Sequence, residues 1–212
     1  MARNAALRKV DFDVYLITDR KLVQEATFFR RVEDALKSGI RAIQLREKDL
    51  KVKELTAYAE EVRKLTDRYG AKLFINDRVD VAIAVGADGV HLGKESIGAT
   101  YVRRISSDLV VGISTHSLGE ALDAQEQGAD FITFGPVYET PSKIKYGAPV
   151  GLDGLRDAAD KINIPLFALG GIDPSNIKNV RDAGATGVAM ISAIFASDNI
   201  NESTKEIMRL MK

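Results

Sequence analysis

Short apolar runs alternate along this chain with longer segments in which apolar residues recur at helical spacing. The short runs are apolar almost throughout, which is typical of strands buried on both faces of a parallel sheet. The longer segments, such as 52–68, 118–127 and 175–183, each have one apolar face. The pattern predicts strands at 14–18, 42–46, 73–76, 89–92, 110–114, 131–135, 166–170 and 188–192.

Strict alternation of strand and helix has two common solutions, an open doubly wound sheet and a closed barrel. No dinucleotide-type glycine fingerprint follows the first predicted strand, and eight strand–helix units are the number that closes a barrel. No linker or low-complexity stretch divides the chain. The sequence therefore predicts a single α/β domain over residues 1–212, a (β/α)8 TIM barrel.

The charge balance narrows the range of partners. Thirty basic residues stand against thirty acidic ones, so no broad field attracts nucleic acid or a membrane surface. No run approaches the roughly 20 apolar residues of a transmembrane helix, and no secretory signal is evident. We expect a cytoplasmic protein whose partners are small molecules, with neither nucleic acid nor membrane among them. The sequence is also compatible with a homo-oligomer.

The chain has no cysteine and two histidines, His91 and His116. Disulfides and thiolate metal sites are thereby excluded, and oxygen ligands favour Mg²⁺ over zinc. Neither histidine belongs to a Ser–His–Asp or zinc arrangement, so a structural role is expected for both.

Polar residues gather where the predicted strands end, which is where a barrel builds its active site. Gln44, Arg46 and Lys48 alternate along the end of the second strand, so their side chains should face the barrel interior. Two cations there need an anion, and an arginine fork with a lysine charge suits a pyrophosphate. The alternative is ion pairing with the carboxylates of Asp19, Asp77 or Glu47.

Four further strand ends, those of the third, sixth, seventh and eighth strands, carry candidate binding groups. Asp77, after the third strand, is a candidate Mg²⁺ ligand, and Asn76 is a candidate phosphate donor; the alternative is an Asx turn. The loop at 135–149 combines hydroxyls, a lysine, glycines and prolines, a composition typical of a lid over an anion or of an ordinary surface loop. Gly170-Gly171 and Ile191-Ser192 offer backbone N–H groups for a phosphate monoester, unless they are only tight turns.

In order along nearly the whole chain, these motifs resemble the thiamine phosphate synthase family, which includes the TenI-like thiazole tautomerases. The resemblance rests on eight segments: YLITDR at 15–20, QLREK at 44–48, INDRVDVA at 75–82, GADGVHLG at 86–93, GISTHS at 112–117, GADFITFGPVYETPSK at 128–143, ALGGI at 168–172 and AMISAIF at 189–195.

The resemblance implies a transferase that joins hydroxymethylpyrimidine diphosphate to a thiazole phosphate, giving thiamine phosphate and pyrophosphate. In such a reaction the diphosphate leaves first and the thiazole nitrogen captures the pyrimidine cation, with Mg²⁺ as cofactor. The implied diphosphate-binding residues are Gln44, Arg46, Lys48, Asn76, Ser114 and Lys143. Arg46, Lys48, Ser114 and Lys143 would be catalytic, and Asp77 would hold Mg²⁺. The implied thiazole phosphate site consists of Thr140, Ser142, Gly171, Ile191 and Ser192.

The chain departs from both branches of this family. Synthases carry an acidic second Mg²⁺ ligand where this sequence has Ser96 next to Glu95, and an Asp where it has Lys145. These features are similar to the TenI-like branch, yet its catalytic histidine is replaced by Pro136. The nearly whole diphosphate set favours the synthase. A thiazole phosphate tautomerase and a non-catalytic, regulatory barrel that binds thiamine phosphate are the alternatives.

Overall fold

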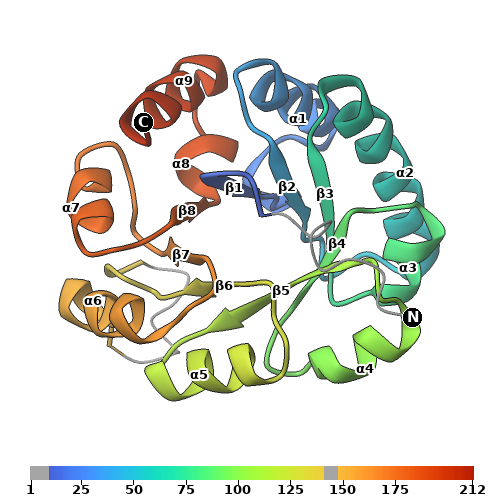
Figure 1. Ribbon diagram of the computed structural model, residues 1–212. Coiled ribbons are helices and arrows are strands. Elements are labelled where there is room, and N and C mark those ends of the chain that lie inside the picture. The colour runs from blue at the N-terminus through green and yellow to red at the C-terminus, as the bar shows by residue number, and fades with distance from the viewer. Residues whose placement is uncertain (1–9, 141–147) are drawn as a thin grey trace.

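A computed structural model of the protein describes residues 10–140 and 148–212. Its strands are all parallel and close into one barrel in the order β1 to β8, so that neighbours in sequence are neighbours in space (Figure 1). This arrangement confirms the predicted (β/α)8 TIM barrel. The strands are β1 (Val14–Ile17), β2 (Ala42–Leu45), β3 (Lys72–Asn76), β4 (Gly89–Leu92), β5 (Val110–Thr115), β6 (Phe131–Phe134), β7 (Leu166–Leu169) and β8 (Gly187–Met190).

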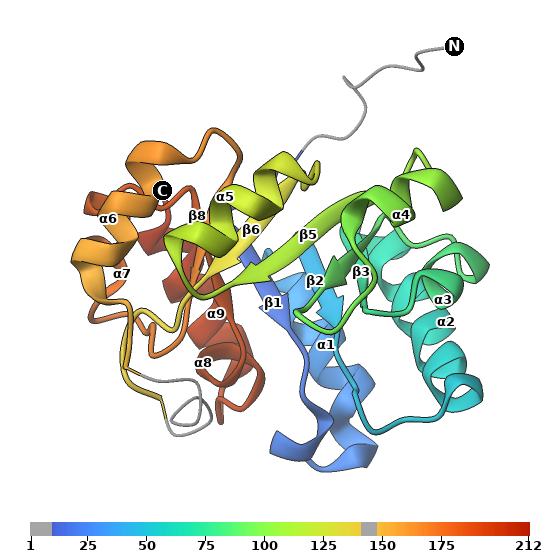
Figure 2. The same cartoon turned by 90° about the horizontal axis from the view of Figure 1, so that it is seen from below.

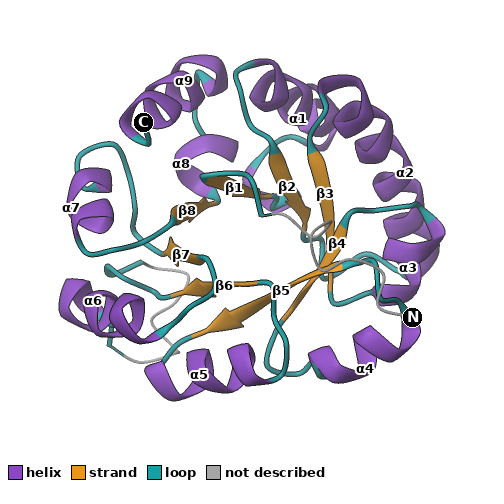
Figure 3. Ribbon diagram, in the orientation of Figure 1, coloured by secondary structure: helices purple, strands orange, loops and turns teal. Residues whose placement is uncertain are grey.

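The helices surround the ring of strands (Figure 3). Short 3-10 turns η2 (Arg20–Leu22) and η3 (Glu25–Thr27) follow β1, and a four-residue helix follows β8. The segment after β1 and this short helix lie toward the same end of the barrel (Figure 2). The helices are α1 (Phe28–Lys37), α2 (Val52–Tyr69), α3 (Val79–Ala84), α4 (Ala99–Ile105), α5 (Leu118–Glu126), α6 (Gly151–Lys161), α7 (Ile177–Asp182), α8 (Ser192–Phe195) and α9 (Ile200–Leu210). Among the described residues, no helix combines the length and apolar character needed to cross a bilayer.

Local sequence explains the longest helix, α2. The Glu54 carboxylate accepts the backbone N–H of Lys51 at 3.2 Å, which satisfies an N–H at the helix start. Gly70 ends the helix with φ of 60°, a left-handed conformation that glycine adopts without a Cβ penalty. Between these ends, apolar side chains at helical spacing face the strands, so α2 is fixed by caps at both ends and burial along one side.

Aromatic rings fill the barrel interior at the end where the strands begin. Phe12, which precedes β1, lies with ring centroids 5.6 Å from Tyr15 and 5.1 Å from Phe167. It also packs edge-on against Phe74 and Phe131, both at 5.8 Å. All five rings are buried. Because this aromatic plug closes the interior at the end where the strands begin, a ligand can enter only where the strands finish.

Glycines in the neighbouring strands make room for three of these rings. A Cβ at Gly89 would lie 2.5 Å from the ring of Phe74, and one at Gly187 would lie 2.5 Å from Phe167. A Cβ at Gly112 would lie 2.4 Å from Phe131. Pairing a large residue with a glycine on the next strand lets the interior reach the close packing that a narrow barrel requires.

Candidate active site

A line of polar side chains crosses the barrel above the aromatic plug. Gln44 Nε2 donates a hydrogen bond to Tyr15 Oη at 3.2 Å, and that oxygen lies 3.4 Å from His91 Nδ1. On the other side of the imidazole, His91 Nε2 lies 3.0 Å from Ser114 Oγ and 3.5 Å from Thr133 Oγ1. Four of these residues are buried, whereas Ser114 is half-buried. The line therefore connects the closed interior to the open end of the barrel.

Burial determines the protonation states of His91 and Tyr15 in this line of polar side chains. The pKa of the His91 imidazole is lowered to about 3, chiefly because burial penalises its charged form. The nearby Asp77 carboxylate raises this pKa and the Arg46 guanidinium lowers it. Burial also raises the pKa of the Tyr15 phenol well above its usual value. At neutral pH both groups are uncharged, and His91 is not an acid or base suited to proton transfer near pH 7.

Arg46 and Lys48 bring positive charge to the same end of the barrel. The Arg46 side chain is half-buried and Lys48 is exposed. Among residues 10–140 and 148–212, no hydrogen bond or ion pair engages the guanidinium of Arg46 or the ammonium of Lys48. The alternative, in which nearby carboxylates form ion pairs with Arg46 and Lys48, is therefore not seen among the described residues. Two cations remain available for an anionic ligand.

The strict alternation predicted through Lys48 is wrong. Strand β2 ends at Leu45, and the backbone N–H of Leu50 donates to the carbonyl of Glu47 at 3.2 Å, which closes a turn. Lys48 lies in this turn at the rim instead of in the barrel interior. Gln44 does face the interior, as expected.

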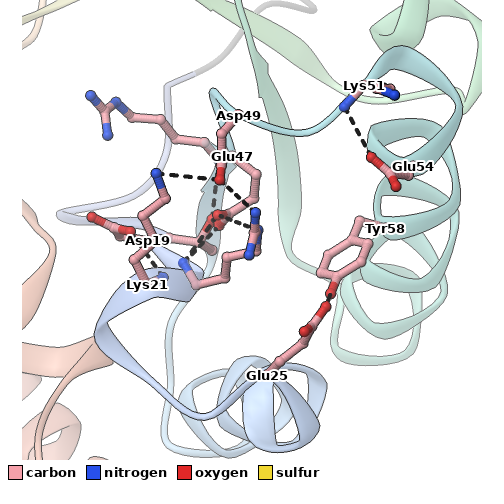
Figure 4. A network of polar contacts seen from close by, with 11 residues as sticks. Asp19, Lys21, Glu25, Glu47, Asp49, Lys51, Glu54 and Tyr58 are labelled. Atoms are coloured by element: carbon pink, nitrogen blue, oxygen red, sulfur yellow. Dashed lines mark hydrogen bonds and ion pairs between the residues drawn. The ribbon is translucent and has the colours of Figure 1, made fainter.

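Glu47, not predicted as a site residue, joins the loops after β1 and β2. Its carboxylate accepts the Thr18 hydroxyl at 2.6 Å and the backbone N–H of Arg20 at 3.0 and 3.2 Å. The same Thr18 oxygen accepts the backbone N–H of Arg46 at 3.1 Å. Around it, Arg20 pairs with Asp49 at 2.6 Å (Figure 4). This contact set, the Glu47 clasp, fixes the backbone that carries Arg46.

The Glu47 clasp is electrostatically unusual because Glu47, an acidic residue, is only 4% exposed. Burial raises the pKa of Glu47, although the hydrogen bonds from Thr18 and Arg20 act in the opposite direction. Asp19 is turned elsewhere, toward the backbone N–H of Lys21 at 3.1 Å (Figure 4). Glu47 is thus held by donors from Thr18 and Arg20, and it does not neutralise Lys48, the next residue in the sequence.

Asp77 stands at the end of β3 with φ of 61°, a left-handed conformation that aspartate tolerates better than most residues. Its carboxylate accepts the Asn76 amide at 2.6 Å, the Gly93 N–H at 3.3 Å and the hydroxyl of Ser96. Glu95, the neighbour of Ser96, is exposed. The described residues contain no cluster of three or more histidine, cysteine or acidic side chains able to hold a metal. Asp77 is therefore a single carboxylate supported by neutral donors.

The loops after β7 and β8 present backbone to the same end. Gly171 has φ of 64°, and a Cβ there would lie 2.6 Å from Tyr138 Cβ and 2.9 Å from the carbonyl of Glu139, so this backbone packs against the loop after β6. Helix α8 begins directly after Ile191, where its first N–H groups have no partner within the helix. Thr140 is half-buried in the loop after β6. Ser142 and Lys143 lie outside the described residues.

Tyr15 and Thr133 were not predicted as site residues, and only a structural role was expected for His91. Strand periodicity was available as a signal, because Tyr15 shares the inward face of β1 with Ile17. What the periodicity could not supply is the partner of each polar group, since the contacts span up to 76 positions in the chain.

Comparison with known proteins agrees with this geometry. Residues 14–194 match the TMP-TENI family, described as thiamine monophosphate synthase. The chain belongs to the thiamine monophosphate synthase family. This confirms the expected family and, at that level, an enzyme of the transferase class.

Individual members of the family are similar over almost the full length. A Geobacter sulfurreducens protein, whose own name as a thiamine-phosphate synthase is provisional, is 52% identical over 206 residues, 97% of each chain. The thiamine-phosphate synthase of Chloroflexus aurantiacus is 39% identical over 202 residues, covering 95% of this chain and 94% of that protein. The solved thiamine phosphate pyrophosphorylase of Pyrococcus furiosus superposes with a TM-score of 0.87 at 36% identity, covering 98% of both chains.

Proposed function

We propose that this protein is a thiamine phosphate synthase, which joins hydroxymethylpyrimidine diphosphate to thiazole phosphate and releases pyrophosphate. The observation that carries the proposal is the half-buried Arg46, which has no carboxylate partner among the described residues and acts electrostatically on His91, the hydrogen-bond partner of Ser114. An unneutralised guanidinium in that position favours a multiply charged anion as its partner.

The reaction that fits these residues breaks the bond between the pyrimidine methylene carbon and the diphosphate oxygen. The electron pair leaves with the diphosphate, where Arg46 and Lys48 stabilise the developing charge and Ser114 and Asn76 add neutral donors. The thiazole nitrogen then forms the new bond to the methylene carbon. Positioning and charge stabilisation suffice for these steps, in keeping with a neutral His91 at the barrel centre.

The metal part of the proposal rests on Asp77. Mg²⁺ in phosphate sites commonly uses one or two carboxylates, water and substrate oxygens, and the oxygen donors at Asp77 fit that requirement. Bound there, Mg²⁺ supplies charge neutralisation for the diphosphate. The Ser96 hydroxyl holds the carboxylate in place, and Glu95 is exposed beside it.

The second substrate is assigned to the loops after β6, β7 and β8. Thr140 and the backbone at Gly171, Ile191 and Ser192 hold the thiazole phosphate, with Ser142 as a further hydroxyl. Lys143 joins Arg46 and Lys48 on the diphosphate. Anion binding by backbone N–H groups before a short helix is the usual arrangement at this end of such barrels.

The test is a condensation assay with purified protein, both phosphorylated substrates and Mg²⁺, with thiamine phosphate measured by chromatography. We expect product formation that stops when EDTA removes the metal. Product that forms at an unchanged rate in EDTA would contradict the metal assignment, and a folded protein that forms none would contradict the synthase.

One observation favours a second candidate, a thiazole phosphate tautomerase. A neutral hydroxyl, Ser96, contacts Asp77 where synthases place a second carboxylate, so the metal site carries less negative charge. Against this candidate, Pro136, buried after β6, supplies no acid or base for the proton shift that a tautomerase performs. The tautomerase would act on the thiazole phosphate alone and be insensitive to EDTA. An assay with the thiazole phosphate alone, run with and without EDTA beside the condensation assay, therefore separates the two functions.

A further inference from the structure

Tyr15 has one proton to donate and, among residues 10–140 and 148–212, two polar neighbours. The phenol is completely buried and neutral, so its O–H needs an acceptor inside the barrel. One neighbour is Gln44 Nε2, an amide nitrogen that donates to Tyr15 Oη and has no acceptor capacity. The other is His91 Nδ1 at 3.4 Å. The Tyr15 proton therefore goes to His91 Nδ1.

This direction fixes the tautomer of His91. A neutral imidazole that accepts at Nδ1 carries its proton on Nε2. Ser114 Oγ, 3.0 Å from Nε2, is then an acceptor. Thr133 Oγ1 lies 3.5 Å from Ser114 Oγ and donates to the same oxygen. Both contacts that reach Ser114 from inside the barrel thus deliver protons to it.

We infer that Tyr15 and His91 are positioning residues that fix Ser114 as a hydrogen-bond donor toward the open end of the barrel. Since the Ser114 oxygen already accepts from the interior, its own proton points to the ligand, and the group it meets there must be an acceptor. The identity of that acceptor, a diphosphate oxygen, rests on the proposed function; the direction of the hydrogen-bond chain does not.

The chain direction can be measured without substrate. In protein labelled with ¹⁵N-histidine, a long-range ¹H–¹⁵N correlation spectrum distinguishes protonated from unprotonated ring nitrogens. The His116→Gln variant assigns the two histidines. We expect His91 at neutral pH to carry its proton on Nε2 alone. A proton on Nδ1, or on both nitrogens, would overturn the inference whatever the enzyme's activity.

A double-mutant cycle tests whether Tyr15 acts through Ser114. Tyr15→Phe should lower kcat for condensation about tenfold, the effect of one misdirected hydrogen bond, and leave KM for the thiazole phosphate unchanged. In a Ser114→Ala background it should change kcat less than about twofold, because the donor it directs is gone. Equal losses in both backgrounds would overturn the positioning role.

Tyr58→Phe is the matched control, because it removes a phenol that bonds Glu25 outside the barrel at 3.0 Å. This variant should leave kcat and the His91 spectrum unchanged. If the wild-type protein proves to have no condensation activity, the proposed function fails, while the ¹⁵N spectrum still decides the direction of the chain.

Discussion

The hydroxyl of Ser96 donates a hydrogen bond to Oδ1 of Asp77, the carboxylate proposed to hold Mg²⁺. The backbone N–H of Gly93 donates to both residues, at 3.3 Å to Asp77 Oδ1 and at 2.7 Å to Ser96 Oγ. Ser96 therefore supports the carboxylate without adding charge, so a Mg²⁺ ion held there would depend on the diphosphate for its remaining negative oxygens.

Ser96→Asp should restore a second carboxylate beside Asp77. We expect the Mg²⁺ concentration for half-maximal activity to fall about tenfold, because a second acidic ligand attracts the cation more strongly. A magnesium titration of condensation activity measures this. Glu95→Gln is the matched control, since Glu95 is exposed one position away, and it should leave the titration unchanged. An identical response in both variants would show that position 96 is remote from the metal.

Arg46→Ala should reduce kcat/KM for the pyrimidine diphosphate by about 100-fold or more, because it removes a charged donor to the leaving group. Arg41→Ala is the control at the opposite end of β2, where Arg41 donates to the carbonyls of Leu36 at 3.3 Å and Ile40 at 2.9 Å. Steady-state kinetics of the two folded variants should show this loss of kcat/KM in Arg46→Ala and not in Arg41→Ala. Wild-type rates for Arg46→Ala would remove the main support for the diphosphate site.

Glu47→Ala should destabilise the protein by about 2–4 kcal/mol, because it leaves the buried Thr18 hydroxyl and the part-buried Arg20 N–H without their acceptor. Asp49→Ala removes an exposed partner of the same arginine and should cost less than about 1 kcal/mol. Urea unfolding measures both. Equal, small losses would mean that the Glu47 clasp does not hold the two loops together.

Stability should fall as the pH is lowered from about 6.5 toward 3. Burial lowers the pKa of His91 in the folded protein to about 3, from an ordinary value of about 6.5, so in this window the unfolded chain binds a proton that the native protein does not. Between pH 7 and pH 5 the loss is about 2 kcal/mol. Urea unfolding at both pH values should show it in the wild type and show less of it in His91→Gln. A pH dependence unaffected by that substitution would mean that His91 is not buried in its neutral form.

Much of the fold could be predicted because parallel-barrel strands are apolar on both faces. The strand predicted at 89–92 is β4 as observed, and most others shift by a residue or two at an end. The strand predicted at 188–192 ends early, at Met190, because Ile191 and Ser192 begin helix α8. Periodicity indicates where an apolar run lies, but not where backbone N–H groups change from strand to helix.

The site was predictable as a set of strand-end polar residues and not as a set of contacts. Gln44, Asp77 and Ser114 were identified from strand ends and family motifs, and all three belong to hydrogen-bond networks at the end of the barrel where the strands finish. The partners of Glu47 were not predictable, because Thr18 and Arg20 reach it from the loop after a different strand, β1. Which carboxylate neutralises which cation depends on register and turns that composition does not encode.

The most direct test of the account is the stoichiometry of the proposed reaction. Purified protein with hydroxymethylpyrimidine diphosphate, thiazole phosphate and Mg²⁺ should form thiamine phosphate and pyrophosphate in equal amounts, and Arg46→Ala should form almost none. Pyrophosphate without thiamine phosphate would indicate hydrolysis instead of condensation. A folded wild-type protein that releases neither product would contradict the proposed function.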